Sequence, residues 1–249
     1  MAIETAVEAF VGGRQRSHPA SELQGIAGPG YEVIAKRLDV GSGVLRASTA
    51  LLSEDERRRA DRLAFDRDRR RFIEARASLR RLLGARLRVR PESVEFSYGP
   101  HGKPDIARPL SVPPLHFNHS RYEDLALYAF SSVNAVGIDV EGVRPIRDAD
   151  DIVSAFFSPR EKAQYFSLRV SDRVAGFFNA WTRKEAFLKA RGGGLAMPLD
   201  AFDVTLGPQD PPLILRIDEG AADGPLWSLA SWSPAPGCVA ALATRDVEP

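Results

Sequence analysis

The chain has 249 residues, of which 44% are hydrophobic and 27% are charged, so it can build a hydrophobic core and is not a disordered chain. Its apolar runs are far shorter than the roughly 20 residues that a membrane-spanning helix needs, and we expect no secretory signal, because no basic segment leads into an apolar stretch near residue 1. Its single cysteine, Cys238, excludes an internal disulfide framework and a multi-cysteine zinc site. We expect a soluble, cytoplasmic, globular protein that enters no membrane.

Charge is balanced over the whole chain but not locally. The 34 basic and 33 acidic residues give a net charge of +1, which argues against wholesale nucleic-acid binding. Between Glu54 and Arg90, however, 14 arginines stand against 7 acids. This excess attracts anions such as phosphate, although a solvated, salt-bridged helix face explains most single arginines. An Arg-rich nucleic-acid-binding module therefore stays as an alternative function.

The first half of the chain predicts a loose lead-in, then helices, then short strands. Residues 1–30 are rich in Gly, Pro, Ser and Ala without a sustained period, and residues 32–39 alternate weakly, as a strand does. A capping box begins at Ser53, and the helical pattern that follows reaches about Leu87 with a break near residues 66–68. Strands are then predicted at 93–98, 115–118 and 125–130.

The second half predicts the same kinds of element in a similar order. A strand at 135–141 is followed by helices at 159–168 and 171–191, the latter ended by three glycines. The remaining strands are expected to form an antiparallel meander over 202–206, 213–217, 226–232 and 239–244. The sequence therefore predicts an α+β fold of two similar lobes with a pseudo-twofold relation, residues 1–133 and 134–249. Each lobe would pack a small antiparallel sheet on long helices.

Two carboxylates in the predicted strand 135–141 form the first candidate site. Asp139 and Glu141 fall on one face, opposite the apolar side chains of that strand, because strand side chains alternate. They would lie about 6–7 Å apart and could share a hard divalent cation, without which their charges repel. An exposed edge strand with two solvated acids explains the same spacing, so the spacing alone is a weak signal.

The predicted helix 171–191 carries the second part of the pattern. Trp181, Glu185 and Lys189 are spaced four residues apart and are nearly aligned, so a carboxylate and an ammonium project beside an apolar ring. Lys184 lies about 100° away and is expected to be a solvated neighbour. A third carboxylate and a lysine near the strand acids would supply what phosphoryl transfer needs, namely a cation on the phosphates and a positive group for the departing charge.

Five short segments, in this order along the chain, resemble motifs of the 4′-phosphopantetheinyl transferases. They are Gly-Lys-Pro at 102–104, His-Phe-Asn-His-Ser-Arg at 116–121, Gly-Ile-Asp-Val-Glu at 137–141, Phe-Phe-Ser-Pro-Arg-Glu at 156–161 and Trp-Thr-Arg-Lys-Glu-Ala-Phe-Leu-Lys at 181–189. The resemblance spans about residues 53–199, and the chain length is similar to that of the two-lobed, surfactin-type subgroup.

The resemblance implies transfer of the 4′-phosphopantetheine arm of coenzyme A to a serine hydroxyl of an apo acyl, peptidyl or polyketide carrier protein, with release of adenosine 3′,5′-bisphosphate. It implies a Mg²⁺ ion on the pyrophosphate, held by Asp139, Glu141 and Glu185. Glu185 is the first choice for the base that removes the serine proton, with Glu161 or a metal-bound water as rivals. Lys189 would offset charge on the leaving bisphosphate. A monomer and a place in secondary metabolite biosynthesis are also expected.

The resemblance also implies contacts to coenzyme A. The lobe 1–133 would hold the nucleotide and its 3′-phosphate, and the lobe 134–249 the metal and the catalytic residues. The residues assigned to coenzyme A are Arg59, Arg71, Arg76, His101, Lys103, Ser120, Arg121, Asp139 and Lys189. Among them Lys103 matches a lysine beside the nucleotide phosphates, Arg59 a basic position that reads the 3′-phosphate, and His101 the adenine side.

The sequence departs from the family pattern after the predicted strand serine. Arg121 stands where the family usually has histidine, and His119 stands where an aliphatic residue is expected. Arginine can still donate two hydrogen bonds to the 3′-phosphate without pH dependence, and a local shift would let His119 take over instead. Arg121 is the preferred assignment. A non-catalytic homologue is disfavoured, because all three carboxylates and Lys189 are present.

Overall fold

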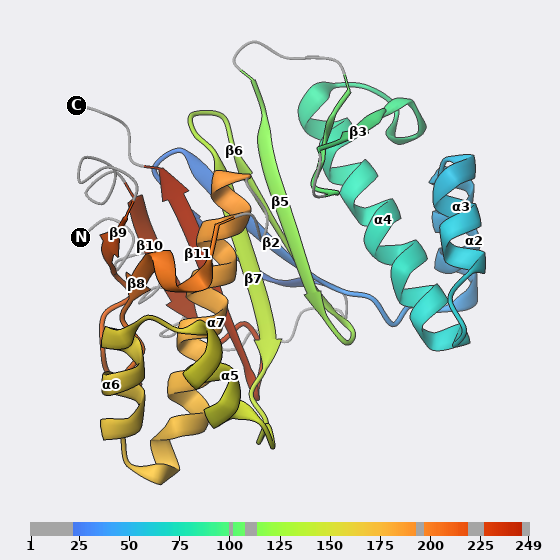
Figure 1. Ribbon diagram of the computed structural model, residues 1–249. Coiled ribbons are helices and arrows are strands. Elements are labelled where there is room, and N and C mark those ends of the chain that lie inside the picture. Colours follow the sequence, from blue (N-terminus) through green and yellow to red (C-terminus); the bar gives the residue numbers. More distant parts are fainter. Residues whose placement is uncertain (1–21, 100–101, 108–113, 193–196, 219–226, 246–249) are drawn as a thin grey trace.

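The computed structural model describes residues 22–99, 102–107, 114–192, 197–218 and 227–245 (Figure 1). Its first half begins with β1 (Glu22–Gly28) and β2 (Tyr31–Arg37). Three helices follow: α2 (Ser42–Leu51), α3 (Glu54–Asp61) and α4 (Asp66–Leu87). After a short 3₁₀ turn, the chain continues through β3 (Phe96–Tyr98), β4 (Pro104–Ile106), β5 (His116–Tyr122) and β6 (Leu125–Ser131).

The second half repeats this order from β2 onward. A strand, β7 (Val136–Gly142), again precedes three helices, which are α5 (Ala149–Phe156), α6 (Pro159–Ser167) and α7 (Val170–Arg191). Four strands close the chain: β8 (Phe202–Val204), β9 (Ile214–Ile217), β10 (Trp227–Trp232) and β11 (Cys238–Arg245). In both halves the third helix is 22 residues long and is followed by a small two-stranded pair.

The sheets have matching strand orders. The first half forms β1-β2-β6-β5 and the second forms β10-β11-β7, so the first strand of each repeat pairs with its last strand. All of these neighbours run antiparallel. The predicted α+β class with small antiparallel sheets is therefore confirmed, and the repeated order agrees with the expected likeness of the two halves.

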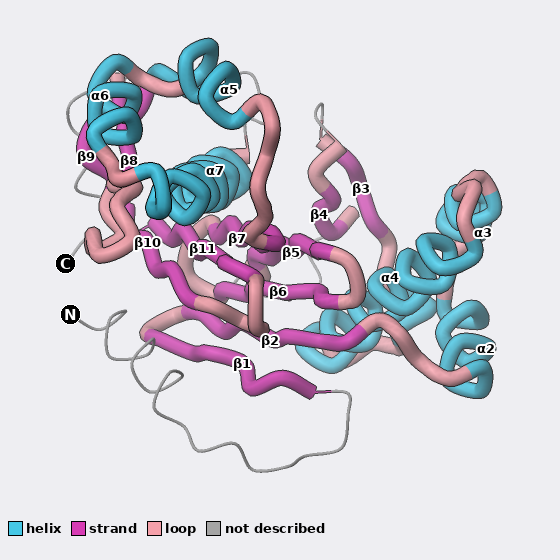
Figure 2. The backbone as a smooth tube through the Cα atoms, turned by 90° about the horizontal axis from the view of Figure 1, so that it is seen from below, coloured by secondary structure: helices cyan, strands magenta, loops and turns pink. Residues whose placement is uncertain are grey.

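The two sheets pack against each other, and each is covered on its outer face by one long helix (Figure 2). Val136, Ile138 and Val140 of β7 lie in the core between the sheets. Helix α4 packs on the other face of the first sheet, where Leu79 and Leu83 are fully buried. Helix α7 packs on the outer face of the second sheet. Alternation along β7 therefore turns Asp139 and Glu141 toward α7, as the sequence predicts.

A glycine sets the distance between β7 and α7. A Cβ atom on Gly137 would lie 2.1 Å from the backbone oxygen of Ala186 and 2.3 Å from the backbone nitrogen of Ala190. Only a residue without a side chain permits this approach. The glycine of the Gly-Ile-Asp-Val-Glu segment therefore brings the strand carboxylates to the helix that carries Glu185 and Lys189.

Some sequence predictions were wrong in detail. The loose lead-in contains β1, and helices α2 and α5 were not predicted. The sequence of α2 is rich in Ser, Thr and Gly, which are poor helix formers, and the helix packs on α4 through Leu45 and Leu51 instead. The expected closing meander is split, because β8 pairs only with β9 while β11 pairs with both β10 and β7.

Within the described segments, no helix has both the length and the apolar character required to cross a membrane.

Candidate active site

The two sheets meet along their edge strands, β5 and β7, which run side by side (Figures 1 and 2). Side chains of β5 bridge the gap. The amide oxygen of Asn118 accepts a hydrogen bond from the backbone N–H of Ile138 at 3.0 Å, and the Ser120 hydroxyl oxygen accepts one from that of Val140 at 3.3 Å. Polar side chains thus satisfy the free edge of β7, which fixes Ser120 beside Asp139.

Asp139 lies at the centre of this junction and is only 4% exposed. Its Oδ1 accepts hydrogen bonds from Lys189 Nζ at 2.6 Å and from Ser120 Oγ at 2.9 Å. Its Oδ2 is buried and has no hydrogen-bond partner among the described residues. A strand of the first half, a strand of the second and α7 therefore converge on one buried carboxylate that has an oxygen to spare.

Glu141 and Glu185 lie close enough to Asp139 for its negative charge to affect their pKa values. Burial, and then the negative charge of Asp139, raise the pKa of Glu141. Burial raises the pKa of Glu185 as well, with a further rise from Asp139 and an opposing effect of Lys189. The structure thus brings the three predicted acids into mutual electrostatic contact. Over the described residues, however, no three acidic, histidine or cysteine side chains are gathered around one ion position.

The aligned stripe on α7 is present as predicted. Trp181, Glu185 and Lys189 are partly exposed, whereas the other side chains between 180 and 190 are buried. Trp181 stacks on Phe177 with ring centroids 5.9 Å apart. The stripe is therefore the one strip of this part of the helix that can reach a ligand.

Lys184 is not a solvated neighbour, and that prediction was wrong. It is fully buried, and its Nζ donates to the backbone oxygens of Leu199 at 2.6 Å and Phe202 at 2.7 Å and lies 2.9 Å from Glu161 Oε1. Helical spacing gives the direction of a side chain but not what covers it, and here the segment that enters β8 covers it.

Glu161 is equally buried and is committed to structure. Its carboxylate accepts backbone hydrogen bonds from Ser158, which it joins in a capping box at the start of α6, and from Val204 of β8. With the Lys184 ion pair this ties α6, α7 and β8 together. A carboxylate so fully paired and 1% exposed is poorly placed to take a proton from a substrate, which argues against Glu161 as the base.

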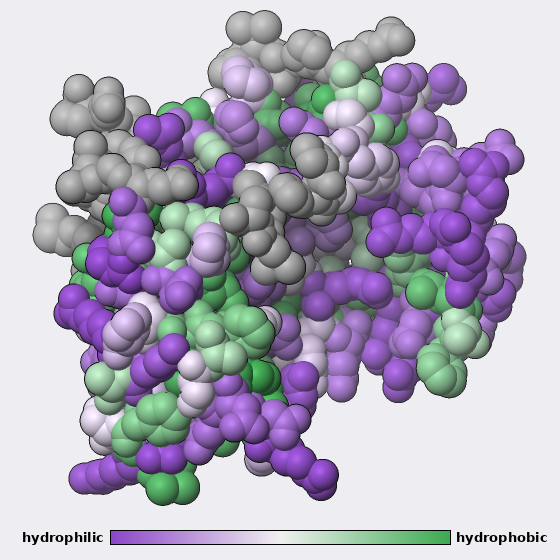
Figure 3. Space-filling view, in the orientation of Figure 1, coloured by the Kyte–Doolittle hydropathy of each residue, from purple (hydrophilic) through white to green (hydrophobic). Residues whose placement is uncertain are grey.

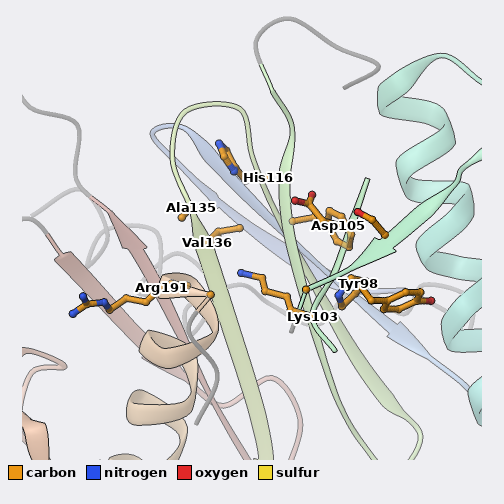
Figure 4. A pocket seen from close by; sticks show the side chains of 13 residues that line it. Tyr98, Lys103, Asp105, His116, Ala135, Val136 and Arg191 are labelled. Atoms are coloured by element: carbon orange, nitrogen blue, oxygen red, sulfur yellow. The ribbon is translucent and has the colours of Figure 1, made fainter. Parts of the chain in front are cut away.

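Lys103 reaches the site from the β3–β4 pair. Its Nζ donates a hydrogen bond to the backbone oxygen of Lys189, and burial lowers its pKa. The side chain extends from the hairpin toward β7 and α7, beside a cavity of about 380 Å³ that Tyr98, His116 and Arg191 also line (Figure 4). The Gly-Lys-Pro segment therefore lies at the junction of the two halves.

A cluster of cations surrounds His119. Burial, and then the positive charges of Arg76, Lys189, Arg121 and Arg59, lower the pKa of His119 to about 3. The imidazole is therefore neutral at physiological pH; it stacks on Tyr128, and its Nδ1 has no hydrogen-bond partner among the described residues. Arg121, in contrast, is exposed as a residue; partial burial of its guanidinium lowers its pKa, but an arginine stays charged at neutral pH.

The other predicted coenzyme A residues differ in how far they are already paired. Arg71 binds Asp39 through two hydrogen bonds of 2.7 and 2.8 Å. Arg76 is buried, donates to Glu56 at 2.5 Å and to the Tyr98 hydroxyl, and stacks over an aromatic ring. Arg59 is exposed and lies over a phenylalanine ring. His101 lies outside the described residues.

Asn118 is the contact that sequence reasoning missed. It lies two residues before Ser120, so alternation along β5 places both on the face toward β7. The same alternation that paired Asp139 with Glu141 would have identified Asn118, had it been applied to this strand.

Comparisons with known proteins identify the family. A family model described as the 4′-phosphopantetheinyl transferase superfamily matches residues 135–240. The chain is 38% identical over 206 residues to the 4′-phosphopantetheinyl transferase HetI of Nostoc sp., covering 83% of this chain and 84% of that protein. It is 29% identical over 157 residues to the 4′-phosphopantetheinyl transferase Sfp of Bacillus subtilis, covering 63% and 67%.

Among solved structures, the holo-[acyl-carrier-protein] synthase of Thermotoga maritima matches with a TM-score of 0.38 and 20% identity, over 47% of this chain and 65% of that one. The 38% identity to the relative of Nostoc sp. extends over most of both chains. The chain therefore belongs to the 4′-phosphopantetheinyl transferases, a family of transferase enzymes.

Proposed function

We propose that this protein transfers the 4′-phosphopantetheine arm of coenzyme A to a serine hydroxyl of an apo carrier protein and releases adenosine 3′,5′-bisphosphate. The observation that carries the proposal is the junction at Asp139, where a buried carboxylate with one unpaired oxygen meets Ser120 and Lys189 from two other segments. Family membership supports the same reaction.

The chemistry of these oxygen donors suits a hard divalent cation, although the three acids of the described chain do not yet surround one point. Asp139 Oδ2 is a carboxylate oxygen to which no described residue donates a hydrogen bond, and the raised pKa values of Glu141 and Glu185 mark negative charge that a cation would relieve. We assign Asp139, Glu141 and Glu185 as the residues that would hold Mg²⁺. When bound there, the ion would neutralise charge on the pyrophosphate of coenzyme A.

Glu185 and Lys189 would carry the proton and the charge. The serine oxygen forms a bond to the phosphorus that bears the pantetheine arm, and the bond from that phosphorus to the bridging oxygen breaks. Glu185, half-buried with a raised pKa, accepts the serine proton. The ammonium of Lys189 stabilises the charge that develops on the departing bisphosphate.

The first half of the chain would hold the nucleotide. Arg59 and Arg121 are exposed cations of the cluster around His119, which suits the dianionic 3′-phosphate. Because His119 is buried and neutral, Arg121 is the stronger candidate for the position of the family histidine. Arg71 and Arg76 are engaged within the protein and would act mainly by holding this surface in place. On this basis we propose that residues 1–133 hold the nucleotide and its 3′-phosphate, and that residues 134–249 supply the metal ligands and the catalytic residues.

The Arg-rich alternative gains no support. The surface over α2, α3 and α4 is mostly hydrophilic (Figure 3). Many of its arginines are engaged by acids, as in the pairs Arg58–Glu54, Arg69–Asp66 and Arg81–Glu74. A helix surface whose positive charges are neutralised in this way offers a nucleic-acid backbone little net charge.

Incubation with an apo carrier protein and a fluorescent coenzyme A analogue tests the proposal. We expect labelling of acyl, peptidyl or polyketide carrier proteins, with natural-product carriers as the favoured class. We also propose that the enzyme acts as a monomer and in the cytoplasm. Labelling should stop when a chelator removes Mg²⁺. Absence of labelling for every carrier class, with Mg²⁺ present, would contradict the proposed function.

A further inference from the structure

Lys189 already binds one oxygen of the carboxylate, Asp139, to which we assign the cation. Its Nζ lies 2.6 Å from Asp139 Oδ1 and 3.4 Å from Ser120 Oγ, so the ammonium has the buried carboxylate as its direct counter-ion. The side chain of Asp139 is only 6% exposed, and a buried carboxylate without a positive partner is strongly unfavourable. Lys189 therefore balances the charge of Asp139 in this structure, while Glu141 and Glu185 keep raised pKa values.

The acids around this ion pair are not yet arranged for an ion. Glu141 and Glu185 sense the charge of Asp139, yet within the described part of the chain no three such side chains surround one point. Two cations in contact with the same carboxylate repel each other, and the burial of Asp139 reduces the screening of that repulsion by water. Full occupancy by Lys189 and by a divalent ion is therefore mutually unfavourable.

The backbone of Lys189 is held in place, whereas its side chain is 30% exposed. Its carbonyl oxygen accepts a hydrogen bond from Lys103 of the other half, and the residue lies in the last turn of α7. The close contact of α7 with Gly137 also fixes the helix against β7. Departure from Asp139 would thus be a rotation of the long side chain alone, with no shift of the helix.

We infer that Lys189 is a built-in counter-ion of Asp139 that competes with the divalent cation, so that cation binding releases Lys189 for contact with substrate phosphate. This inference rests on the proposed function, because it takes the cation site and the phosphate role of Lys189 from it. Competition is reciprocal: the ion pair lowers the affinity for the cation by the same factor by which the cation weakens the ion pair. Lys189 would then reach the phosphates only in the loaded site.

Calorimetric titration with Mg²⁺ alone, without coenzyme A, tests the competition. We expect Lys189→Met to bind Mg²⁺ at least about tenfold more tightly than the wild-type protein, because the competing ammonium is gone. Lys162→Met is the matched control, because this substitution removes the same formal charge from α6, away from the junction. Its affinity should equal that of the wild-type protein. Equal or weaker binding by Lys189→Met, including no binding by either protein, would overturn the inference.

Thermal unfolding gives a second readout on the same variants. Without metal, Lys189→Met should unfold at a lower temperature than Lys162→Met, because Asp139 has lost its partner. Mg²⁺ should then raise the unfolding temperature of Lys189→Met more than that of the wild-type protein. An equal rise would contradict competition.

Amine labelling of the wild-type protein covers the case in which Lys189→Met does not fold. We expect the Lys189 amine to be protected without metal and to react several-fold faster in Mg²⁺, with the rate at Lys162 unchanged, as measured by peptide mass spectrometry. An unchanged rate at Lys189 would overturn the inference. The carrier-labelling assay on the wild-type protein distinguishes this failure from failure of the proposed function, because transfer would still occur.

Discussion

Helices α4 and α7 are each 22 residues long and hold the same place in the two halves, but the buried carboxylates beside them differ. Next to α4, Glu56 is 2% exposed, and its oxygens are bound by Arg76 at 2.5 Å and Arg80 at 2.7 Å. Next to α7, Asp139 has one oxygen bound by Lys189, and its other oxygen has no partner within the described segments. The two carboxylates are thus similarly buried, but they differ in how many of their oxygens are bound by basic side chains.

The difference separates a carboxylate that stabilises the fold from one that can take a ligand. The arginines beside Glu56 lower its pKa despite its burial, which indicates net stabilisation of the ionised form. The acids beside Asp139 have raised pKa values because burial and mutual repulsion are not fully compensated. Uncompensated charge at a junction of elements is typical of a functional site. Substitutions at the two carboxylates should therefore affect different properties.

The largest effect is expected for Asp139→Asn. The change preserves shape but removes the charge that would hold the cation, so the rate of carrier modification should fall by about 10³-fold or more. Glu92→Gln, at an exposed position, is the control and should transfer normally. Intact-mass measurement of the carrier after timed incubation gives the rate. Normal transfer by Asp139→Asn would contradict the assignment of Asp139 as the carboxylate that holds the cation.

The next largest effect is expected for Glu56→Ala, on stability. The change leaves Arg76 and Arg80 buried without their carboxylate, so the free energy of unfolding should fall by about 3–5 kcal/mol. Urea unfolding followed by circular dichroism measures it. A variant that unfolds like the wild-type protein would show that the network around Glu56 contributes little.

Gly137→Ala should have an intermediate effect. The added Cβ would overlap the backbone of α7, so the helix must move away from β7, at about 1–3 kcal/mol of stability. Transfer should fall as well, because Glu185 and Lys189 move away from the strand carboxylates. Gly41→Ala is a suitable control, since a Cβ there would meet nothing within 4 Å. Unimpaired transfer by Gly137→Ala would contradict the need for this close approach.

The smallest effect is a pH dependence of stability. Because the pKa of Glu56 is lowered by folding, its ionised form stabilises the native state above its ordinary value of 4.5, and this contribution is lost as pH falls through the lower native pKa. The difference in unfolding free energy between the wild-type protein and Glu56→Gln should be constant near neutral pH and should narrow in acid below pH 4.5. A difference that widens in acid would reverse the assigned sign.

The sequence predicted the part of the site that depends on local periodicity. Alternation placed Asp139 and Glu141 on one face of β7, and four-residue spacing aligned Glu185 with Lys189 on α7. It could not predict which of these charges would be covered, because burial depends on elements far along the chain. Lys184 illustrates this limit: its neighbours Leu199 and Phe202 are distant in sequence, and only folding brings them together.

The same limit explains the missed elements. Helix α2 has a weak helical sequence, and it is stabilised by tertiary contact with α4. The junction of β5 with β7 depends on side-chain hydrogen bonds from Asn118 and Ser120, and no propensity encodes such contacts between strands of different sheets.

A crystal structure with coenzyme A and Mn²⁺ in place of Mg²⁺ would test the central assignment most directly, because the anomalous signal locates the ion. We predict one peak in contact with Asp139 Oδ2, with Glu141 and Glu185 turned toward it, and Lys189 Nζ moved from Asp139 to a phosphate oxygen. A peak that does not touch Asp139, with the Lys189–Asp139 pair intact beside bound coenzyme A, would contradict it.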